Sequence, residues 1–379
     1  MNANFRFEIE AVDPQSRARA GRLHTPHGDI ETPIFMPVGT RASVKALTSA
    51  QLLELNAQII LSNSYHLFCR PGTELIAAAG GLHGFMGWPR PILTDCGGFQ
   101  IFSLKDTMKL DDEGVGFRSI IDGAAHFWTP EDNMRVQQQL GADIIMQLDV
   151  CAPYPAEREE VELAMRRSYA WARRCRVYHT SPAQALFAIV QGGMHQDLRL
   201  ENIKQLRLIE QETAEFEGYA LGGYSVGEPH QQMLASMEEV TGYLPVDKPH
   251  YLMGVGNPKS LLAAIALGID MFDSVLPTRT ARLGTAFTSQ GRLNLRNARF
   301  ARDFSSLDEN CSCATCQQHS RAYLRHLIQS KEISAAVLLS LHNIHYLLNL
   351  MQQARTALLQ GSYQSFLANW LDSAAANDY

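Results

Sequence analysis

Short runs of apolar residues recur along the middle of the chain, and each ends on a polar or glycine residue before a helical-looking segment. Uninterrupted apolar runs are typical of strands buried on both faces, as in parallel sheets. The segments between them include PAEREEVELAMRRSYAWARRCRVYH, which has apolar residues at helical spacing. The pattern therefore predicts alternating strands and helices. The predicted strands are AQIILSN (57–63), PILTD (91–95), DIIMQLD (143–149), LFAIVQG (186–192), YALGG (219–223), HYLMGVG (250–256) and DMFDSVL (270–276).

Such alternation fits either an eight-stranded barrel or an open doubly wound sheet. Polar and glycine residues at the predicted strand ends are spread across the whole middle of the chain, and in a barrel such ends meet at one mouth. A Rossmann-type sheet would concentrate its site at a glycine-rich first turn, and no G-x-G-x-x-G follows the first strand. We therefore predict an α/β protein with a (β/α)₈ barrel. The strand-end residues are Asp95, Asp149, Gln191, Gly223 and Asp273.

Two segments fall outside this alternation. Residues 1–40, with FRFEIEAV, AGRLHTPHGDIETP and IFMPVGT, are expected to form a small antiparallel sheet that caps one end of the barrel. Residues 41–379 would form the catalytic barrel, with an inserted subdomain at about 280–350 and a closing C-terminal helix. No internal repeat or linker separates independent domains.

Three of the seven cysteines lie within six residues, in Cys311-Ser-Cys313-Ala-Thr-Cys316, and His342 follows in a helical-looking segment. Three thiolates and one imidazole are the ligand set of a closed tetrahedral zinc site. Scattered buried or reactive cysteines are the alternative, and the tight clustering argues against it. We predict one structural zinc ion per subunit, which joins the cysteine segment to a later helix.

Composition indicates where such a site would occur. The chain has 379 residues, of which 46% are hydrophobic and 19% charged, as in an ordinary globular protein. The start, MNANFRFEIEAV, lacks the basic residues and long apolar run of a secretory signal, and no uninterrupted apolar run reaches membrane-spanning length. The remaining four cysteines show no paired spacing. We therefore expect a cytoplasmic protein, in which metal binding is favoured over disulfides.

The charge is unevenly distributed. The formal net charge of −6 disfavours nucleic acid as a partner, yet the stretch between residues 279 and 302 contains six arginines and no acidic residue. A solvated surface normally carries both positive and negative side chains, whereas a run of arginines without acidic residues is suited to bind phosphate groups. We therefore predict RNA or phosphate contact here. The six are Arg279, Arg282, Arg292, Arg296, Arg299 and Arg302.

The segment LTDCGGFQ (93–100) is a strand that runs into a glycine pair. The glycines allow the backbone to approach a ligand closely. Asp95 would lie at the barrel mouth, and Phe99 offers a flat face for stacking. The alternative is an ordinary strand-to-helix turn with Asp95 as a helix cap.

Asp273 is a charged residue inside an apolar strand, which is costly unless it is partnered or functional, and Pro277 ends that strand. Asp149 follows IIMQL in the same way. Three carboxylates at one mouth suit displacement at a sugar carbon. An ion pair between Asp273 and Arg279 or Arg282, or a divalent metal site, is the alternative. The strand ends QGG (191–193) and GGY (222–224) add an amide and bare backbone groups, which suit a planar heterocycle.

With these motifs in place, nearly the whole chain resembles the bacterial tRNA-guanine transglycosylases. The motifs that carry the resemblance are TDCGGFQIFSL, LDVCAPYP, QGG, YALGG with YSVGE, LMGVGNP, FDSVLPTR, and C-x-C-x-x-C with a later HN. The resemblance implies a (β/α)₈ barrel with a zinc subdomain. It also implies exchange of guanine at position 34 of tRNAs with GUN anticodons (those for Asp, Asn, His and Tyr) for a 7-deazaguanine base.

The resemblance also assigns roles. Asp273 would be the nucleophile at the ribose C1′, giving a covalent enzyme–tRNA intermediate, and Asp95 the proton acceptor for the incoming base. A homodimer would be common in this family. The implied base-binding residues are Asp95, Cys96, Gly97, Gly98, Phe99, Asp149, Gln191 and Gly223. The implied RNA contacts are Gly254, Val255, Gly256, Asn257, Pro258, Lys259, Ser260, Thr278, Arg279, Thr280, Ala281 and Arg282.

Some positions depart from the family pattern. Cys96 stands where Ser is usual, Ser274 where Cys is usual, and Leu283 where Asn is usual. The first two exchanges are between small residues. The third concerns a detail of tRNA contact.

A second group of departures bears on the base itself. Val150 stands where the family usually has Glu, and Tyr224 and Ser225 where it usually has Leu and Ala. In the family these positions line the base pocket, where the acid supports a loop that recognises an aminomethyl group. We therefore hypothesise a base preference that differs from that of the preQ1-using type, with queuine accepted.

Two rival functions remain. A zinc hydrolase would need an open coordination position, whereas three cysteines and one histidine close the shell. A non-catalytic RNA-binding module would leave three strand-end carboxylates without a purpose.

Overall fold

The computed structural model describes residues 4–102, 108–373 and 376. Within these residues, eight parallel strands pair in the order β4, β14, β13, β12, β11, β10, β6, β5. A parallel bridge between Val38 and Leu61 joins the two outer strands, so the sheet closes into a barrel as predicted. The strands are β4 (Ile34–Pro37), β5 (Ile60–Asn63), β6 (Ile92–Asp95), β10 (Ile144–Met146), β11 (Ala185–Val190), β12 (Gly218–Leu221), β13 (His250–Leu252) and β14 (Met271–Ser274).

Seven of these strands are the predicted ones, and the eighth corrects the prediction. The segment Ile34–Pro37 was expected in the N-terminal antiparallel sheet, but it pairs in parallel with β14, with Ile34 opposite Met271 and Pro37 opposite Ser274. All four of its residues are buried, as a strand covered on both faces requires. The first barrel strand therefore lies before residue 40 rather than after it.

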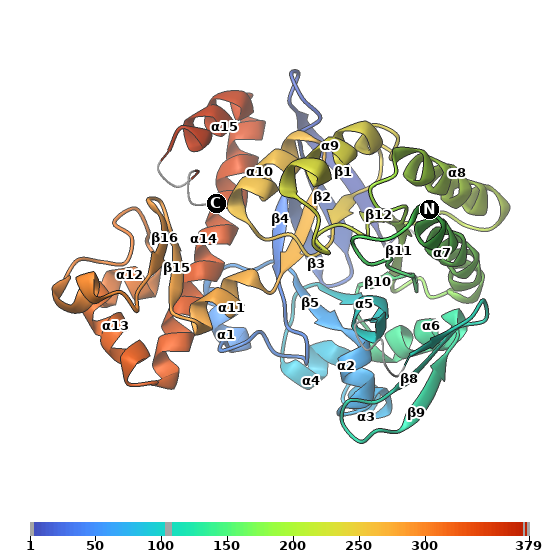
Figure 1. Cartoon of the computed structure of the whole chain (residues 1–379), viewed down its shortest axis with the longest axis horizontal. Helices are drawn as coiled ribbons and strands as arrows, with labels where there is room; N and C mark the ends of the chain where they lie inside the picture. The colour runs from blue at the N-terminus through green and yellow to red at the C-terminus, as the bar shows by residue number, and fades with distance from the viewer. Residues whose placement is uncertain (1–3, 103–107, 374–375, 377–379) are drawn as a thin grey trace.

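The N-terminal sheet consists of β1 (Arg6–Val12), β2 (Arg19–Thr25) and β3 (Gly28–Thr32), all antiparallel. A buried ion pair joins it to the barrel, because Arg19 Nη2 lies 2.6 Å from Asp270 Oδ2 just before β14. The long helix α14 (Ile333–Leu359) also holds the sheet, since Arg355 donates to the Gly21 and Thr32 carbonyls at 2.8 and 2.7 Å. The sheet thus closes the end of the barrel opposite the strand C-termini (Figure 1).

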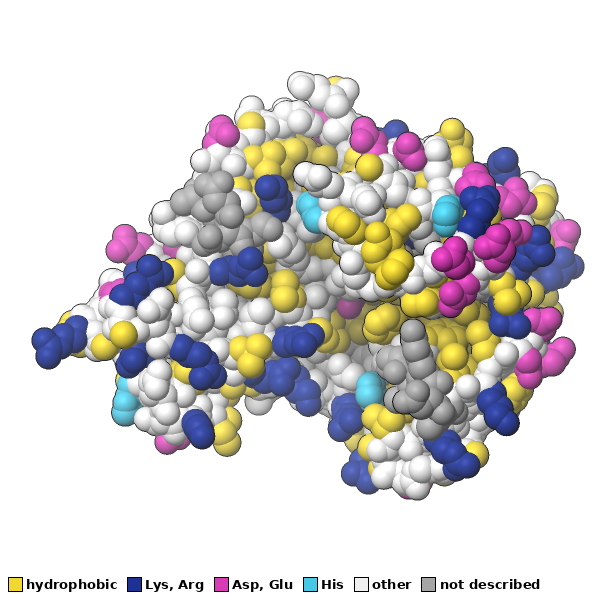
Figure 2. Space-filling view, in the orientation of Figure 1, with side chains coloured by type: hydrophobic (Ala, Val, Ile, Leu, Met, Phe, Trp, Pro, Cys, Tyr) yellow, Lys and Arg dark blue, Asp and Glu magenta, His cyan; other side chains and the backbone are white. Residues whose placement is uncertain are grey.

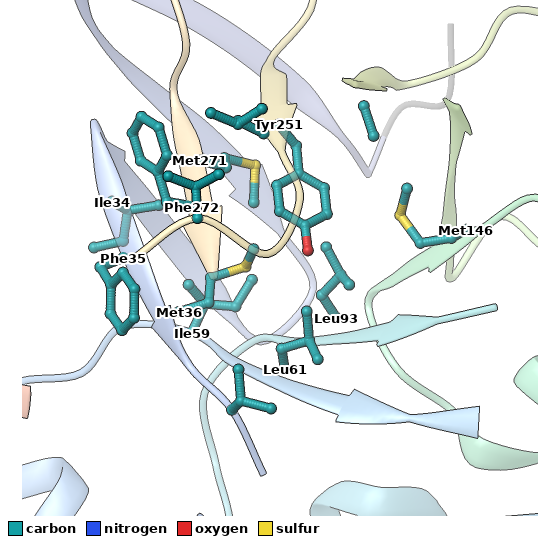
Figure 3. Close-up of a cluster of buried hydrophobic side chains, with 14 of the residues drawn as sticks. Ile34, Phe35, Met36, Ile59, Leu61, Leu93, Met146, Tyr251, Met271 and Phe272 are labelled. Carbon is teal, nitrogen blue, oxygen red and sulfur yellow. The ribbon is translucent and has the colours of Figure 1, made fainter. Parts of the chain in front are cut away.

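Apolar side chains fill the barrel. Leu61, Leu93, Met146 and Met271 come from strands far apart in the sequence and are buried (Figure 3). Helices follow the strands along the chain, as the periodicity indicates. They are α1 (Ser49–Glu54), α2 (Ser64–Cys69), α3 (Thr73–Ala78), α4 (Gly81–Met86), α5 (Gly98–Phe102), α6 (Pro130–Leu140), α7 (Arg158–Tyr178), α8 (Gln196–Glu212), α9 (His230–Thr241), α10 (Pro258–Ala266) and α11 (Leu276–Arg282).

A three-stranded antiparallel sheet between β6 and α6 was not predicted. It consists of β7 (Lys109–Leu110), β8 (Val115–Arg118) and β9 (Ala125–Trp128). Aromatic contacts attach it to α2, because Phe68 meets Phe117 and Trp128 edge to face. Its strands, of two to four residues each, are too short to stand out from a loop in the sequence.

The predicted insert is a second small unit beside the barrel (Figure 1). It contains β15 (Thr285–Thr288), β16 (Gly291–Asn294), the 3₁₀ helix η2 (Ala298–Arg302), α12 (Ala314–Gln318) and α13 (Arg321–Gln329). Helix α14 lies between the two units, and α15 (Tyr363–Leu371) follows it. By length and hydropathy α14 could cross a membrane, but half of its most apolar window is buried inside the molecule. It is a core helix that joins the insert to the barrel.

Candidate active site and metal centre

The five strand-end residues lie on different strands at the same end of the barrel, where barrel enzymes build their sites. Asp95 is the last residue of β6, and Asp273 lies within β14. Gln191 directly follows β11. Asp149 and Gly223 come three and two residues after the ends of β10 and β12. The barrel thus brings together residues that are up to 178 positions apart in the sequence.

Asp273 is held by two donors. The Tyr251 hydroxyl donates to its Oδ1 at 2.6 Å, and the Gly254 backbone N–H donates to the same oxygen at 2.7 Å. Burial raises the pKa of Asp273 above its ordinary value, although both hydrogen bonds favour the charged form. No hydrogen bond to Oδ2 occurs among the described residues. The second oxygen is therefore available to attack an electrophile.

Asp95 is held differently. The Asn63 side-chain amide lies 2.7 Å from both carboxylate oxygens, and the Gly97 N–H donates at 3.2 Å. Burial raises the pKa of Asp95 to about 7; the Asn63 hydrogen bonds oppose this rise, and the nearby charge of Asp273 adds to it. A carboxyl group with a pKa near neutrality is suited to accept and release a proton. The two carboxylates are close enough to influence each other, yet their environments differ.

Asp149 is the centre of a third group. Its Oδ2 accepts a hydrogen bond from Gln191 Nε2 at 2.6 Å, and its Oδ1 accepts one from the Cys96 thiol at 3.1 Å. Burial raises the pKa of both Asp149 and Cys96. A Cβ on Gly98 would lie 2.9 Å from the Asp149 carbonyl, so this position has room only for glycine. Cys96, Gly98, Asp149 and Gln191 therefore form one packed, polar group.

Phe99 and Gly223 border the open part of the site. The Phe99 side chain is 55% exposed, and it lines a cavity of about 660 Å³ together with Val150, Cys151 and Val226. Gly223 has φ +70°, which a side chain disfavours, and a Cβ there would lie 2.7 Å from Gln191 Oε1. The site therefore combines buried polar groups with an apolar cavity, an arrangement that suits a planar heterocycle.

The four predicted metal ligands form a buried cluster at the junction of the insert and α14. The Nδ1 atom of His342 lies 3.7, 3.5 and 3.3 Å from the sulfur atoms of Cys311, Cys313 and Cys316. The other nitrogen of this ring, Nε2, lies 2.6 Å from the Phe287 carbonyl oxygen, to which it can only donate. This contact leaves the Nδ1 lone pair directed at the three sulfurs, as a metal ligand requires.

A second cluster of potential ligands lies at the opposite end of the barrel. His27 and His83 contact the two oxygens of Asp143 at 2.7 and 3.1 Å. Their rings are stacked, with centroids 3.6 Å apart and planes inclined by 14°. Two parallel rings at this spacing cannot both direct an in-plane lone pair at one ion. The arrangement is instead a hydrogen-bonded clamp that ties the β2–β3 turn to β10.

The predicted RNA-contacting residues differ in exposure. Arg279 and Arg282, on α11 directly after Asp273, are exposed. Lys and Arg side chains gather over this part of the surface (Figure 2). Within the described residues, no ion pair neutralises Arg279, Arg282, Arg296, Arg299 or Arg302. Buried members of the predicted set are Val255, Gly256, Pro258, Ser260, Thr278 and Ala281; Gly254 is exposed, and Asn257, Lys259 and Thr280 are partly buried.

Three contact residues at the mouth were not singled out from the sequence. Asn63 is the last residue of β5, so it could have been predicted in the same way as Asp95, as a polar residue at the end of a barrel strand. Tyr251 lies within an apolar strand, and the sequence therefore predicts a core residue. Arg199 lies in the first turn of α8 and is fully buried, although arginines are mostly exposed. The last two could not be found by pattern, because their partners come from distant segments.

Comparison with known proteins agrees with this geometry. The profile of the queuine tRNA-ribosyltransferase family matches residues 13–376. A queuine tRNA-ribosyltransferase of Ruminiclostridium cellulolyticum is 50% identical over 361 residues, which is 95% of each chain. One from a Thermoanaerobacter species is 52% identical over 96% of each chain, and one from Herpetosiphon aurantiacus is 51% identical over 97% of this chain and 92% of its own. This chain belongs to the queuine tRNA-ribosyltransferase (tRNA-guanine transglycosylase) family and is a pentosyltransferase.

Proposed function

We propose that the enzyme exchanges guanine at wobble position 34 of tRNAs with GUN anticodons for a 7-deazaguanine base, by two displacements at the same ribose carbon. The observation that carries this proposal is the pair of differently held carboxylates, Asp273 and Asp95, at one barrel mouth. Two inversions retain the configuration at the sugar, as in retaining glycosidases.

In the first displacement, the free oxygen of Asp273 bonds to C1′ while the bond from C1′ to guanine N9 breaks. Guanine leaves with the bonding electrons, and its N9 takes up a proton from the solvent. In the second, Asp95 accepts the N9 proton of the incoming base, whose nitrogen attacks C1′ and expels Asp273 as a carboxylate. The raised pKa of Asp95 supports its role in proton transfer. The target base must leave the anticodon stack, which costs less in a loop than in a duplex.

We propose that Asp149, Gln191 and Gly223 hold the base, with Cys96, Gly97 and Gly98 shaping the pocket and Phe99 stacking on the ring. Asp149 offers carboxylate acceptors, and Gln191 offers an amide beside it. Gly97 has φ +77°, and a Cβ there would lie 2.7 Å from Tyr65 Cβ. The backbone can therefore approach the ligand closely only with glycine at this position.

We also propose that the Cys₃His cluster holds one structural zinc ion per subunit. Tetrahedral zinc with bonds of about 2.3 Å to sulfur and 2.0 Å to nitrogen places S and N about 3.5 Å apart. The three S···N distances, 3.3 to 3.7 Å, bracket this value. Four protein ligands leave no position for a reacting water. The ion would therefore hold the fold, and a zinc-hydrolase function is disfavoured.

The exposed arginines support tRNA binding on the insert side of the mouth. Arg279 and Arg282 lie on the helix that begins three residues after Asp273, so phosphates held there would lie beside the nucleophile. We further propose a cytoplasmic homodimer in which one subunit orients the tRNA while the other reacts. This division reconciles tRNA binding with the net charge of −6.

For the incoming base, we propose that queuine is accepted as well as preQ1. Val150 supports this, because its apolar side chain lines the 660 Å³ cavity and leaves room for a large 7-substituent. Tyr224 gives no support to this proposal, because its side chain is buried and points toward Ser236. Its hydroxyl lies 2.8 Å from the Ser236 hydroxyl. Glu228 accepts the N–H groups of Ser225 and Val226, so it fixes this loop from within.

Competition between the two bases tests this proposal. A tRNA with guanine at position 34 is incubated with equal preQ1 and queuine, and the incorporated nucleosides are quantified by mass spectrometry. We expect comparable incorporation by the wild-type enzyme. The variant Val150→Glu should shift incorporation toward preQ1, and Val150→Thr, which has a similar volume and no charge, should not. Strong preQ1 preference in the wild type would disprove the queuine proposal, and absence of guanine release would disprove the exchange itself.

The raised pKa of Asp95 predicts a pH profile. Asp95 accepts protons only as a carboxylate, so kcat/KM for exchange should fall as the pH drops through about 7. Asn63→Ser removes the amide that stabilises the carboxylate but keeps a capping oxygen for α2. This variant should move the acidic limb to higher pH. A flat profile, or a limb that Asn63→Ser leaves in place, would exclude Asp95 as the titrating group.

A further inference from the structure

Arg199 is a buried arginine whose charge has no acidic partner. Its side chain is fully buried, and within the described residues no carboxylate lies within ion-pair distance of it. Instead it donates to three carbonyl oxygens, those of Gly193 at 2.7 Å, Gly222 at 2.9 Å and Val190 at 3.2 Å. A buried charge is costly unless every donor is used, so such a residue requires an explanation beyond packing.

Two of the three carbonyls belong to the strand-end loops that form one wall of the site, and the third, that of Val190, ends β11. Gly193 follows Gln191, and Gly222 precedes Gly223, so a single guanidinium fork joins both loops. The loops also pack tightly on each other, because a Cβ on Gly222 would lie 2.5 Å from Gln191 Nε2. The Gly192 backbone also lies close to Arg199, since a Cβ on Gly192 would lie 2.7 Å from the Arg199 backbone nitrogen.

Tyr224 holds the guanidinium from its other side. The centre of its ring lies 3.7 Å from Arg199 Cζ, which is a cation–π contact. The tyrosine is itself fixed, because its hydroxyl lies 2.8 Å from Ser236 Oγ on α9. This explains why Tyr224 faces away from the cavity. Its ring provides the face on which the arginine lies.

The contact with Gly222 has an electronic effect as well. The Gly222 carbonyl and the Gly223 N–H belong to the same peptide unit, so a cationic donor on the oxygen makes that N–H a stronger donor. The Gly223 N–H lies against the Cys151 thiol at the wall of the cavity. A base carbonyl that replaces the Cys151 sulfur as the acceptor of this N–H would gain a stronger hydrogen bond, most of all when the base carries negative charge as it leaves or attacks.

We propose that Arg199 is a positioning residue that sets base affinity, by fixing the Gln191 and Gly222–Gly223 loops and polarising the Gly222–Gly223 peptide toward the base. This inference rests on the proposed role of Gln191 and Gly223 in holding the base. It predicts that Arg199 and Tyr224 act on the base and not on the tRNA.

The test separates the two substrates. Arg199→Lys keeps the charge but loses the planar fork that reaches three carbonyls. We expect the KM for the base to rise about tenfold, with the KM for tRNA unchanged within about twofold. A merely structural role would instead reduce the active fraction, lowering kcat and leaving both KM values unchanged.

Tyr224 provides a second pair of variants that does not depend on Arg199→Lys folding. Tyr224→Leu removes the ring and should raise the KM for the base about threefold. Tyr224→Phe keeps the ring and should behave as the wild type. If neither Arg199→Lys nor Tyr224→Leu changes the KM for the base, the inference is wrong.

The variant Gln191→Met tests separately whether Gln191 binds the base at all, which is the assumption on which the role of Arg199 rests. A raised base KM in Gln191→Met, with native values in the other two variants, overturns the role of Arg199 alone. A native base KM in Gln191→Met overturns the pocket assignment.

Discussion

Asp273→Asn is expected to lower guanine exchange by on the order of 10⁴-fold and to abolish any tRNA adduct that survives denaturation. The amide matches the carboxylate in shape and can still accept hydrogen bonds from Tyr251 and Gly254, so the loop geometry should persist. It cannot form an ester with C1′. Exchange is measured by release of labelled guanine, and the adduct by a shift on a denaturing gel.

Two comparisons sharpen this experiment. Asp247→Asn makes the same change on an exposed loop and should retain both activity and adduct. Asp95→Asn should still form the adduct but fail to resolve it with a new base, because it leaves the nucleophile intact and removes the proton acceptor. Retained exchange in Asp273→Asn would disprove the covalent mechanism, and loss of the adduct in Asp247→Asn would show that the assay reports folding.

Cys313→Ala is expected to release the metal and to lower the thermal stability of the insert. Structural zinc sites supply much of the folding free energy of the segments they join, and three ligands hold zinc far more weakly than four. Helix α14 carries His342 and, beside it, Asn343, which donates to the Pro277 and Thr285 carbonyls at 3.0 Å. Losing the metal should therefore disturb α11 and its exposed arginines, and so weaken tRNA binding.

Metal content, thermal denaturation and tRNA affinity are the three measurements. Cys69→Ala removes a thiol outside the cluster and should keep the metal. An unchanged metal content in Cys313→Ala would contradict the ligand assignment. Lost metal with native tRNA affinity would contradict the proposed link from the cluster through Asn343 to α11.

The hydrophobic pattern was enough to predict alternating strands and helices, because strands buried on both faces leave a continuous apolar run. The polar and glycine residues at the strand ends then favoured the barrel over an open sheet. The hydrophobic pattern misassigned Ile34–Pro37, since four buried residues after a turn look alike in an antiparallel and a parallel sheet. It missed β7 to β9, whose strands pair only with one another and expose much of their surface. Strands of this kind depend on their neighbours more than on their own composition.

The site shows the same division. The sequence alone determined which residue types end the strands, and where three cysteines and a histidine could meet, since strand ends and ligand spacing are local properties. Only the tertiary structure decided which groups face each other: Asn63 on Asp95, Tyr251 on Asp273, and Arg199 across two loops onto Tyr224. These contacts join positions up to 32 residues apart through the packing of neighbouring strands, helices and loops of the barrel. The geometry of these contacts sets the pKa of Asp95 and places the Arg199 charge on the Gly222 carbonyl. A local sequence pattern cannot predict either effect, because both depend on contacts between separate segments.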